Sequence, residues 1–185
     1  MESFSVAANP NDILHFWRAA GPTKWFKHDR PFDEAIRLKF EPVHHAAARG
    51  EYDKWAENPE SALALLILLD QFPRNLYRGS GHAFATDGKA RAVARAATAA
   101  GFHAAVELGL RQFFVLPFEH SEDLADHAVA ERLAKSLNDP DLIRWAALHR
   151  DIVARFGRFP HRNAAMGRVT SATEQEFLDE GGFAG

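Results

Sequence analysis

The sequence contains no cysteine. This absence excludes disulfide bonds, cysteine-ligated metal sites and thiol catalysis, and it fits a reducing compartment. The first twelve residues have neither the basic start nor the apolar core of a secretory signal. We therefore expect a cytoplasmic protein.

Long basic runs and long apolar runs are also missing. The formal net charge is −3 over 185 residues. A nucleic-acid-binding protein typically has clustered basic residues and a positive charge balance, which this sequence does not show. Phenylalanine outnumbers tyrosine by 15 to 2, so the aromatic residues favour core packing over a platform for stacking bases. The apolar run at residues 62–69 is far too short to span a bilayer. We expect neither nucleic acid nor a membrane as a partner.

The sequence carries none of the short motifs that name a reaction. HExxH, GxSxG, the Walker A motif and GxGxxG are all absent. The sequence therefore identifies no cofactor, reaction or oligomeric state.

What the sequence does contain is a strong helical pattern. Periodic stretches rich in Ala and Leu recur, whereas alternating strand patterns do not. The pair Asp139–Pro140 is typical of a helix start. Ser171 and Glu174 have the spacing of a capping box, and Asp87 is the expected cap of an Ala-rich helix. We predict an all-α protein, one domain over residues 1–185, with about eight helices paired as antiparallel hairpins.

The pattern is organised around a central helix at residues 61–78. Its run of eight apolar residues leaves no polar face, so other elements must surround it. We predict that Leu63, Leu66, Ile67 and Leu69 are fully buried. Asp70 follows this run near the end of the helix, where a carboxylate needs a cation. Arg74 or an arginine of residues 158–162 is the expected partner.

Two loops with similar sequences follow apolar helices, at residues 71–75 and 158–163. In each, an aromatic residue and a proline precede an arginine and an asparagine, a set of donors suited to carboxylate or phosphate. Equally, such side chains commonly bond the last carbonyl groups of a helix. The candidate ligand-binding residues are Asp70, Arg74, Asn75, Arg162 and Asn163.

A third segment, at residues 118–127, is dense in ionisable groups. Glu119 and His120 are candidates for general acid–base catalysis, with His161 as a further candidate catalytic residue. The four-residue steps between Glu119, Asp123 and His127 also suit a divalent metal, although we assign no metal ligand. Alternatively, Ser121 caps a helix with a solvated acidic face and Glu119 pairs with an arginine. We interpret His149 as a core histidine that is hydrogen-bonded to a carbonyl group.

Three motifs together resemble the bacterial family called domain of unknown function 924. They are LLDQFPRNLYRG at residues 68–79, LPFEHSEDL at residues 116–124 and FGRFPHRN at residues 156–163. The resemblance implies a tetratricopeptide-like array of stacked helix hairpins, although the sequence shows no regular 34-residue repeat. It implies no catalytic residues, because the family is defined without a function.

Two functions fit these observations. In the first, the three polar segments meet in one pocket and hold a small anionic molecule, either for binding alone or for catalysis. In the second, the protein is a tetratricopeptide-like scaffold that binds a peptide or protein partner in a helical groove, and the polar groups are structural.

Overall fold

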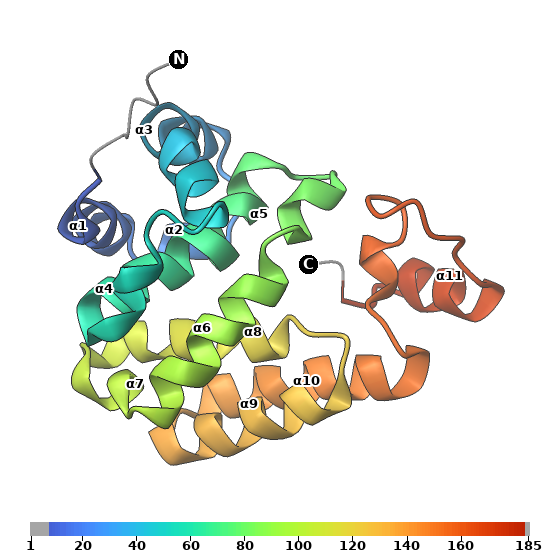
Figure 1. Cartoon of the computed structure of the whole chain (residues 1–185). Coiled ribbons are helices and arrows are strands. Elements are labelled where there is room, and N and C mark those ends of the chain that lie inside the picture. Colours follow the sequence, from blue (N-terminus) through green and yellow to red (C-terminus); the bar gives the residue numbers. More distant parts are fainter. Residues whose placement is uncertain (1–7, 184–185) are drawn as a thin grey trace. The chain divides into compact units, whose positions relative to one another are not determined.

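A computed structural model describes residues 8–183, which form helices and no strands. The predicted all-α class is confirmed (Figure 1). The helices of eight residues or more are α1(Pro10–Ala20), α3(Arg30–Ala48), α4(Pro59–Leu66), α6(Asp87–Ala99), α9(Leu124–Leu137), α10(Pro140–Phe156) and α11(Ala172–Asp179). The shorter α-helices are α2(Pro22–Trp25), α5(Phe72–Leu76), α7(Phe102–Ala105) and α8(Leu116–Glu119). The 3-10 helices are η1(Asp53–Glu57), η3(Gly81–Phe84), η4(Leu108–Phe114) and η5(Pro160–Arg162), and η2(Ile67–Gln71) is a π-helix.

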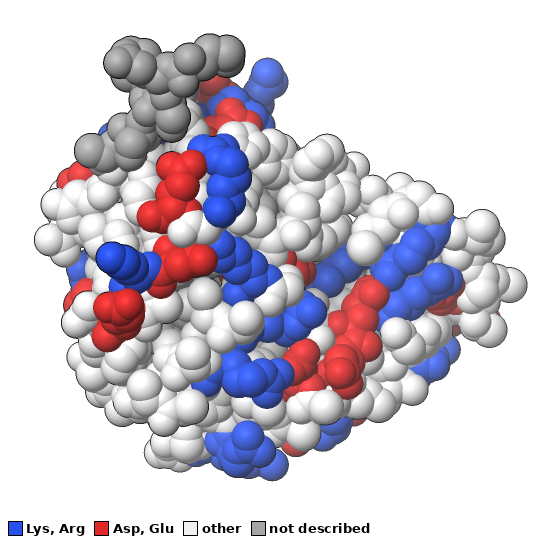
Figure 2. Space-filling view, in the orientation of Figure 1, with Lys and Arg blue, Asp and Glu red and all other residues white. Residues whose placement is uncertain are grey.

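The chain divides into two compact units. The first comprises residues 1–78 and 82–117, and the second comprises residues 79–81 and 118–185. The single domain expected from the sequence stays a prediction. On the face shown in Figure 2, basic and acidic side chains are interspersed. Within residues 8–183, no helix has both the length and the hydropathy needed to cross a membrane.

The first unit is built around the predicted central helix. Elements α4, η2 and α5 follow one another without a break from Pro59 to Leu76. Leu63, Leu66, Ile67 and Leu69 are at most 1% exposed, which confirms that this helix is buried. Helices α1 and α6 both contact α4. The wholly apolar run thus has the neighbours that it requires on several sides.

The central helix contains a π-helical turn that the sequence did not predict. At η2 the helix widens, and such turns leave a backbone carbonyl without its usual partner. Side chains supply the missing donors here: His44 Nδ1 lies 2.8 Å from the Leu68 carbonyl oxygen, and Thr86 Oγ1 lies 2.5 Å from that of Leu69. Burial lowers the pKa of His44, which keeps its ring neutral. The turn carries Asp70, which is 1% exposed.

The second unit contains an antiparallel hairpin of α9 and α10, which lie side by side (Figure 1). Asn138 ends α9 in the left-handed conformation, with φ of 53°. Asp139 then caps α10 by accepting hydrogen bonds from two backbone N–H groups, as its Asp–Pro signal predicts. The predicted capping box of Ser171 and Glu174 starts α11.

Candidate functional site

Asp70 and Arg74 lie in the first unit, where Asp87 joins them. Arg74 Nη1 is 3.3 Å from Asp70 Oδ1, so the predicted pairing of Asp70 with an arginine is confirmed. The Arg74 guanidinium also binds both carboxylate oxygens of Asp87, at 3.1 Å each. Burial opposes the charge, but the two carboxylates together raise the pKa of Arg74. The prediction that Asp87 caps α6 was wrong, because Thr86 holds the cap position and Asp87 faces Arg74 instead.

Asn75 belongs to a different group of polar side chains in the same unit. Its amide nitrogen is 2.7 Å from Asp33 Oδ1, and the Asn75 side chain is buried. Arg78 donates to both oxygens of the same carboxylate, at 2.7 and 3.1 Å. The sequence did not single out Asp33, which lies about forty residues away in the first turn of α3.

In the second unit, Glu119 at the end of α8 meets His149 in the middle of α10. His149 Nδ1 lies 2.9 Å from Glu119 Oε2, and the two residues are 7% and 0% exposed. The prediction that His149 bonds a carbonyl group was therefore wrong, whereas the alternative that pairs Glu119 with an arginine stays a prediction. Nδ1 donates in this contact because a carboxylate oxygen accepts, and Nε2 is the second ring nitrogen. Nε2 forms no hydrogen bond with any group in residues 8–183.

Aromatic rings enclose this pair. The ring centroid of His149 lies 5.7 Å from Phe159, 4.8 Å from Phe183 and 6.1 Å from Trp145. Gly182 makes the position of Phe183 possible, because a Cβ atom at Gly182 would come within 2.4 Å of the Phe177 carbonyl oxygen. These rings reduce the access of water to the Glu119–His149 pair, which strengthens electrostatic interactions there.

His161 and His120 lie beside the same pair. The ring of His161 packs 5.2 Å from Phe183 and 5.6 Å from Phe159, and the ring of His120 is 6.5 Å from His149. Burial, together with the charge of Arg162, lowers the pKa of His161 to about 3, so this ring is neutral at neutral pH. His161 Nδ1 is buried and has no hydrogen-bond partner within residues 8–183.

Arg162 joins this cluster, whereas Asn163 does not. The guanidinium of Arg162 lies over the Phe159 ring at 4.4 Å, and its Nη1 donates to the His120 carbonyl oxygen at 2.9 Å. The Asn163 amide nitrogen instead approaches Thr170 Oγ1 at 3.4 Å. Four of the predicted site residues, Glu119, His120, His161 and Arg162, thus gather around His149, which the sequence had not assigned to a site.

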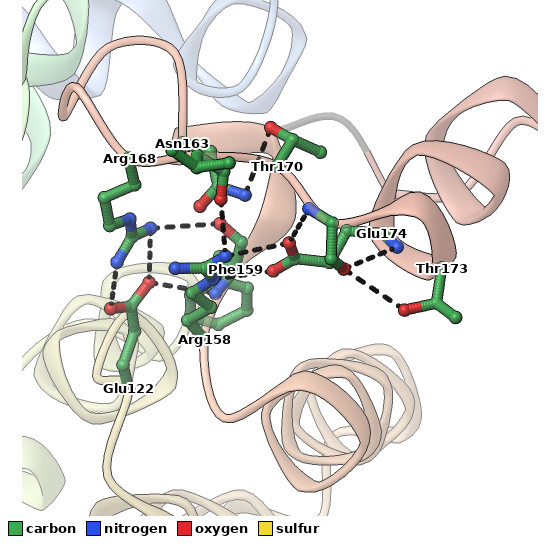
Figure 3. A network of polar contacts seen from close by, with 10 residues as sticks. Glu122, Arg158, Phe159, Asn163, Arg168, Thr170, Thr173 and Glu174 are labelled. Carbon is green, nitrogen blue, oxygen red and sulfur yellow. Dashed lines mark hydrogen bonds and ion pairs between the residues drawn. The ribbon is translucent and has the colours of Figure 1, made fainter.

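Two further ion pairs hold the segment that follows α10 (Figure 3). Arg168 binds both oxygens of Glu122 at 2.7 and 3.0 Å, and Arg158 binds both oxygens of Glu174 at 2.6 and 2.8 Å. Glu122 also accepts a hydrogen bond from the backbone N–H of Phe159. Hydrogen bonds from Arg158 lower the pKa of Glu174, and those from Arg168 lower the pKa of Glu122 against the opposing effect of burial. These arginines have a structural role.

The acidic segment before α9 forms local hydrogen bonds. Asp123, and not Ser121 as predicted, caps α9 by accepting from the Ala125 N–H. Ser121 donates to Asp126 at 2.7 Å, and His127 Nε2 donates to the Ser121 carbonyl oxygen at 2.8 Å. Across the described part of the chain, no group of three His, Asp or Glu residues is placed to hold a metal ion.

Arg74 and Asn75 belong to the first unit, and the other two predicted segments belong to the second. The meeting of all three segments in one pocket stays a prediction.

Sequence and structure comparisons now place this chain among known proteins. Residues 13–182 match the model of a family described as bacterial proteins of unknown function, DUF924. A solved structure of a protein of unknown function from Agrobacterium tumefaciens is similar in fold, with a TM-score of 0.89 and 48% sequence identity. That likeness covers 92% of this chain and 97% of the other. No curated protein matches the sequence. Because the family model spans nearly the whole chain, this protein belongs to the DUF924 family.

Proposed function

We propose that the second unit binds a small anionic molecule and that Glu119 and His149 act on it as an acid–base pair. The observation that carries this proposal is the 2.9 Å contact between Glu119 Oε2 and His149 Nδ1 in a buried position. A carboxylate on Nδ1 stabilises the imidazolium that forms when Nε2 takes a proton. Nε2 has no hydrogen-bond partner within the described residues, so it is available to a ligand.

The neighbouring groups support an anion as the ligand. Arg162 is a permanent cation beside the pair, and its ring contact with Phe159 fixes the plane of the guanidinium. Guanidinium geometry matches the oxygens of a carboxylate or a phosphate. His161 is neutral, and its buried Nδ1 can donate to or accept from a bound oxygen atom.

The residues of the first unit have a different part in this proposal. Asp70 and Asp87 already occupy the guanidinium of Arg74, which favours a structural role for that group. His120 is a secondary candidate, because its ring is 6.5 Å from the ring of His149. Asn163 is the weakest ligand-binding candidate, because its amide turns toward Thr170.

Ligand-induced stabilisation tests the proposal. The thermal midpoint would be measured with acetate, succinate and benzoate, for the wild type and for His149→Gln and Glu119→Gln. An anion present at about 100 times its dissociation constant adds about 2.7 kcal/mol to the stability of the native state. We expect at least one of these anions to raise the wild-type midpoint, and we expect His149→Gln to abolish the shift.

The matched control is His15→Gln, because His15 is exposed on α1 and belongs to the first unit. This variant should keep the full shift. Histidine ring nitrogen resonances of the wild type provide a second measurement that does not depend on how well the variants fold. Equal shifts in all variants, or no shift of the His149 resonances with any anion, would refute the proposal.

We also propose, as the alternative function, a tetratricopeptide-like scaffold that binds a peptide. The antiparallel hairpin of α9 and α10 supports this arrangement, and Trp145 and Leu148 on α10 are each 39% exposed. Large exposed apolar side chains on one helix suit contact with a partner. Selection from a random peptide library should yield binders that lose affinity for a Trp145→Ser, Leu148→Ser double variant. A Leu38→Ser variant on α3 is the control, and binders that tolerate the double variant would contradict this alternative.

A further inference from the structure

A polar cavity of about 320 Å³ lies in the first unit, beside the first turns of α3 and the end of α5. Three arginines line it: Arg30 and Arg37 from α3, and Arg78 from the residues that follow α5. Two acids of α3 also line the cavity. The proposed acid–base pair belongs to the second unit, so this cavity is a separate feature.

Arg78 is held in a fixed orientation. Asp33 accepts from its Nε at 2.7 Å and from its Nη2 at 3.1 Å. Buried Asn75 fixes Asp33 in turn through a hydrogen bond of 2.7 Å. An arginine that is already oriented loses little side-chain entropy when a ligand binds. Its remaining nitrogen, Nη1, has no hydrogen-bond partner within residues 8–183.

The other two arginines, Arg37 and Arg30, differ in how many ion pairs and hydrogen bonds they form within the protein. Arg37 donates to Glu41 at 3.0 Å and to the Leu76 carbonyl oxygen, and it lies 3.7 Å from Glu34. It therefore forms a wall of the cavity and contributes little free charge. Arg30 is exposed and makes no ion pair or side-chain hydrogen bond with any described residue.

We infer that this cavity binds the phosphoryl group of a small molecule, with Arg30 and Nη1 of Arg78 as its two cationic ligands. Two guanidinium groups from separate segments can hold the oxygens of one dianion, and guanidinium geometry matches phosphate. The positive end of the α3 dipole is at the same place and favours an anion further. His28, which also lines the cavity, can add a donor on the ligand side. A cavity of this volume is at the small end of ligand pockets, which suits a phosphate monoester.

Calorimetric titration of the whole protein with inorganic phosphate and with glycerol phosphate, at low ionic strength, tests this inference. Losing one charge-assisted hydrogen bond costs about 1.5–3 kcal/mol, and 1.4 kcal/mol corresponds to a tenfold change in affinity. Arg30→Ala should therefore weaken phosphate binding at least about tenfold. Added salt should weaken binding to the wild type, because the site is open to solvent.

Arg132→Ala is the matched control. Arg132 is exposed on α9 in the second unit and, like Arg30, has no ion pair with a described residue. Its substitution and His149→Gln should leave phosphate affinity unchanged, so this inference and the proposed acid–base site can fail separately. An equal loss in Arg132→Ala, or a loss in His149→Gln with none in Arg30→Ala, would overturn the inference. Acetate binding that is as tight as phosphate binding and is weakened by Arg30→Ala would also overturn it, because the cavity would then accept any carboxylate.

Discussion

The substitution Leu66→Ala tests how strongly the central helix organises the first unit. Leu66 is 1% exposed, and its neighbours on both sides along the helix are equally buried. Leucine-to-alanine changes in cores cost about 2–5 kcal/mol, and the cost is highest where the surroundings cannot collapse into the cavity. Since helices contact α4 on several sides, we expect the upper part of this range, about 3–5 kcal/mol. The thermal midpoint should fall by roughly 6–20 °C, at about 2–4 °C per kcal/mol.

Urea unfolding followed by tryptophan fluorescence provides the assay. Three of the four tryptophans lie in the first unit, and the fourth is Trp145 in the second. In a Trp145→Phe background, the fluorescence change therefore reports on the first unit alone. Leu38→Ala is the control, because Leu38 is 76% exposed on α3 and its truncation should change stability by less than about 0.5 kcal/mol. A loss below about 1 kcal/mol for Leu66→Ala would mean that the helix is peripheral to folding.

Two other substitutions probe buried titratable groups, one in each unit. Asp70→Asn should lower the free energy of unfolding in urea by about 1.5–3 kcal/mol, because Arg74 loses one of its two carboxylates. The control is Asp141→Asn, at an exposed ion pair, which should change stability by close to nothing. Equal losses in the two variants would contradict a buried pairing of Asp70 with Arg74. The pKa of His161 is about 3 when folded and near 6.5 when unfolded, so below pH 6.5 the unfolded chain binds a proton that the folded protein excludes. The free energy of unfolding should fall as pH drops from 6.5 toward 3, and His161→Gln should flatten that fall between pH 7 and pH 5; an unchanged slope would show that other groups cause it.

The features that the sequence predicted correctly depend on residues close together in the chain. The apolar run at residues 62–69 determines burial by its own composition, whatever surrounds it. Ser171 and Glu174 form their capping box within one helical turn. Asp70 and Arg74 are four residues apart, and a carboxylate at the end of an apolar helix has few other neighbours of opposite charge. Such local signals can be recognised in the sequence without knowledge of the tertiary structure.

The features that it missed depend on residues far apart. Glu119 and His149 are 30 residues apart, and the seam of α10 indicated that His149 is buried without indicating its partner. The useful signal was chemical: a glutamate next to the apolar end of a helix and a histidine on an apolar seam each need a polar partner. The π-helical turn gives no such signal, because the donors that support it, His44 and Thr86, come from other segments.

The two buried charge groups differ in what they leave unused, and this difference separates a structural network from a candidate site. Arg74 directs both of its terminal nitrogens at carboxylates, so a ligand would have to displace a strong hydrogen bond to reach it. At His149, the carboxylate engages one ring nitrogen and leaves the other without a partner among the described residues. His161 likewise has a buried nitrogen whose hydrogen-bonding capacity is unmet within residues 8–183. Unmet hydrogen-bonding capacity in a buried place costs stability, and a bound ligand that satisfied it would recover that free energy.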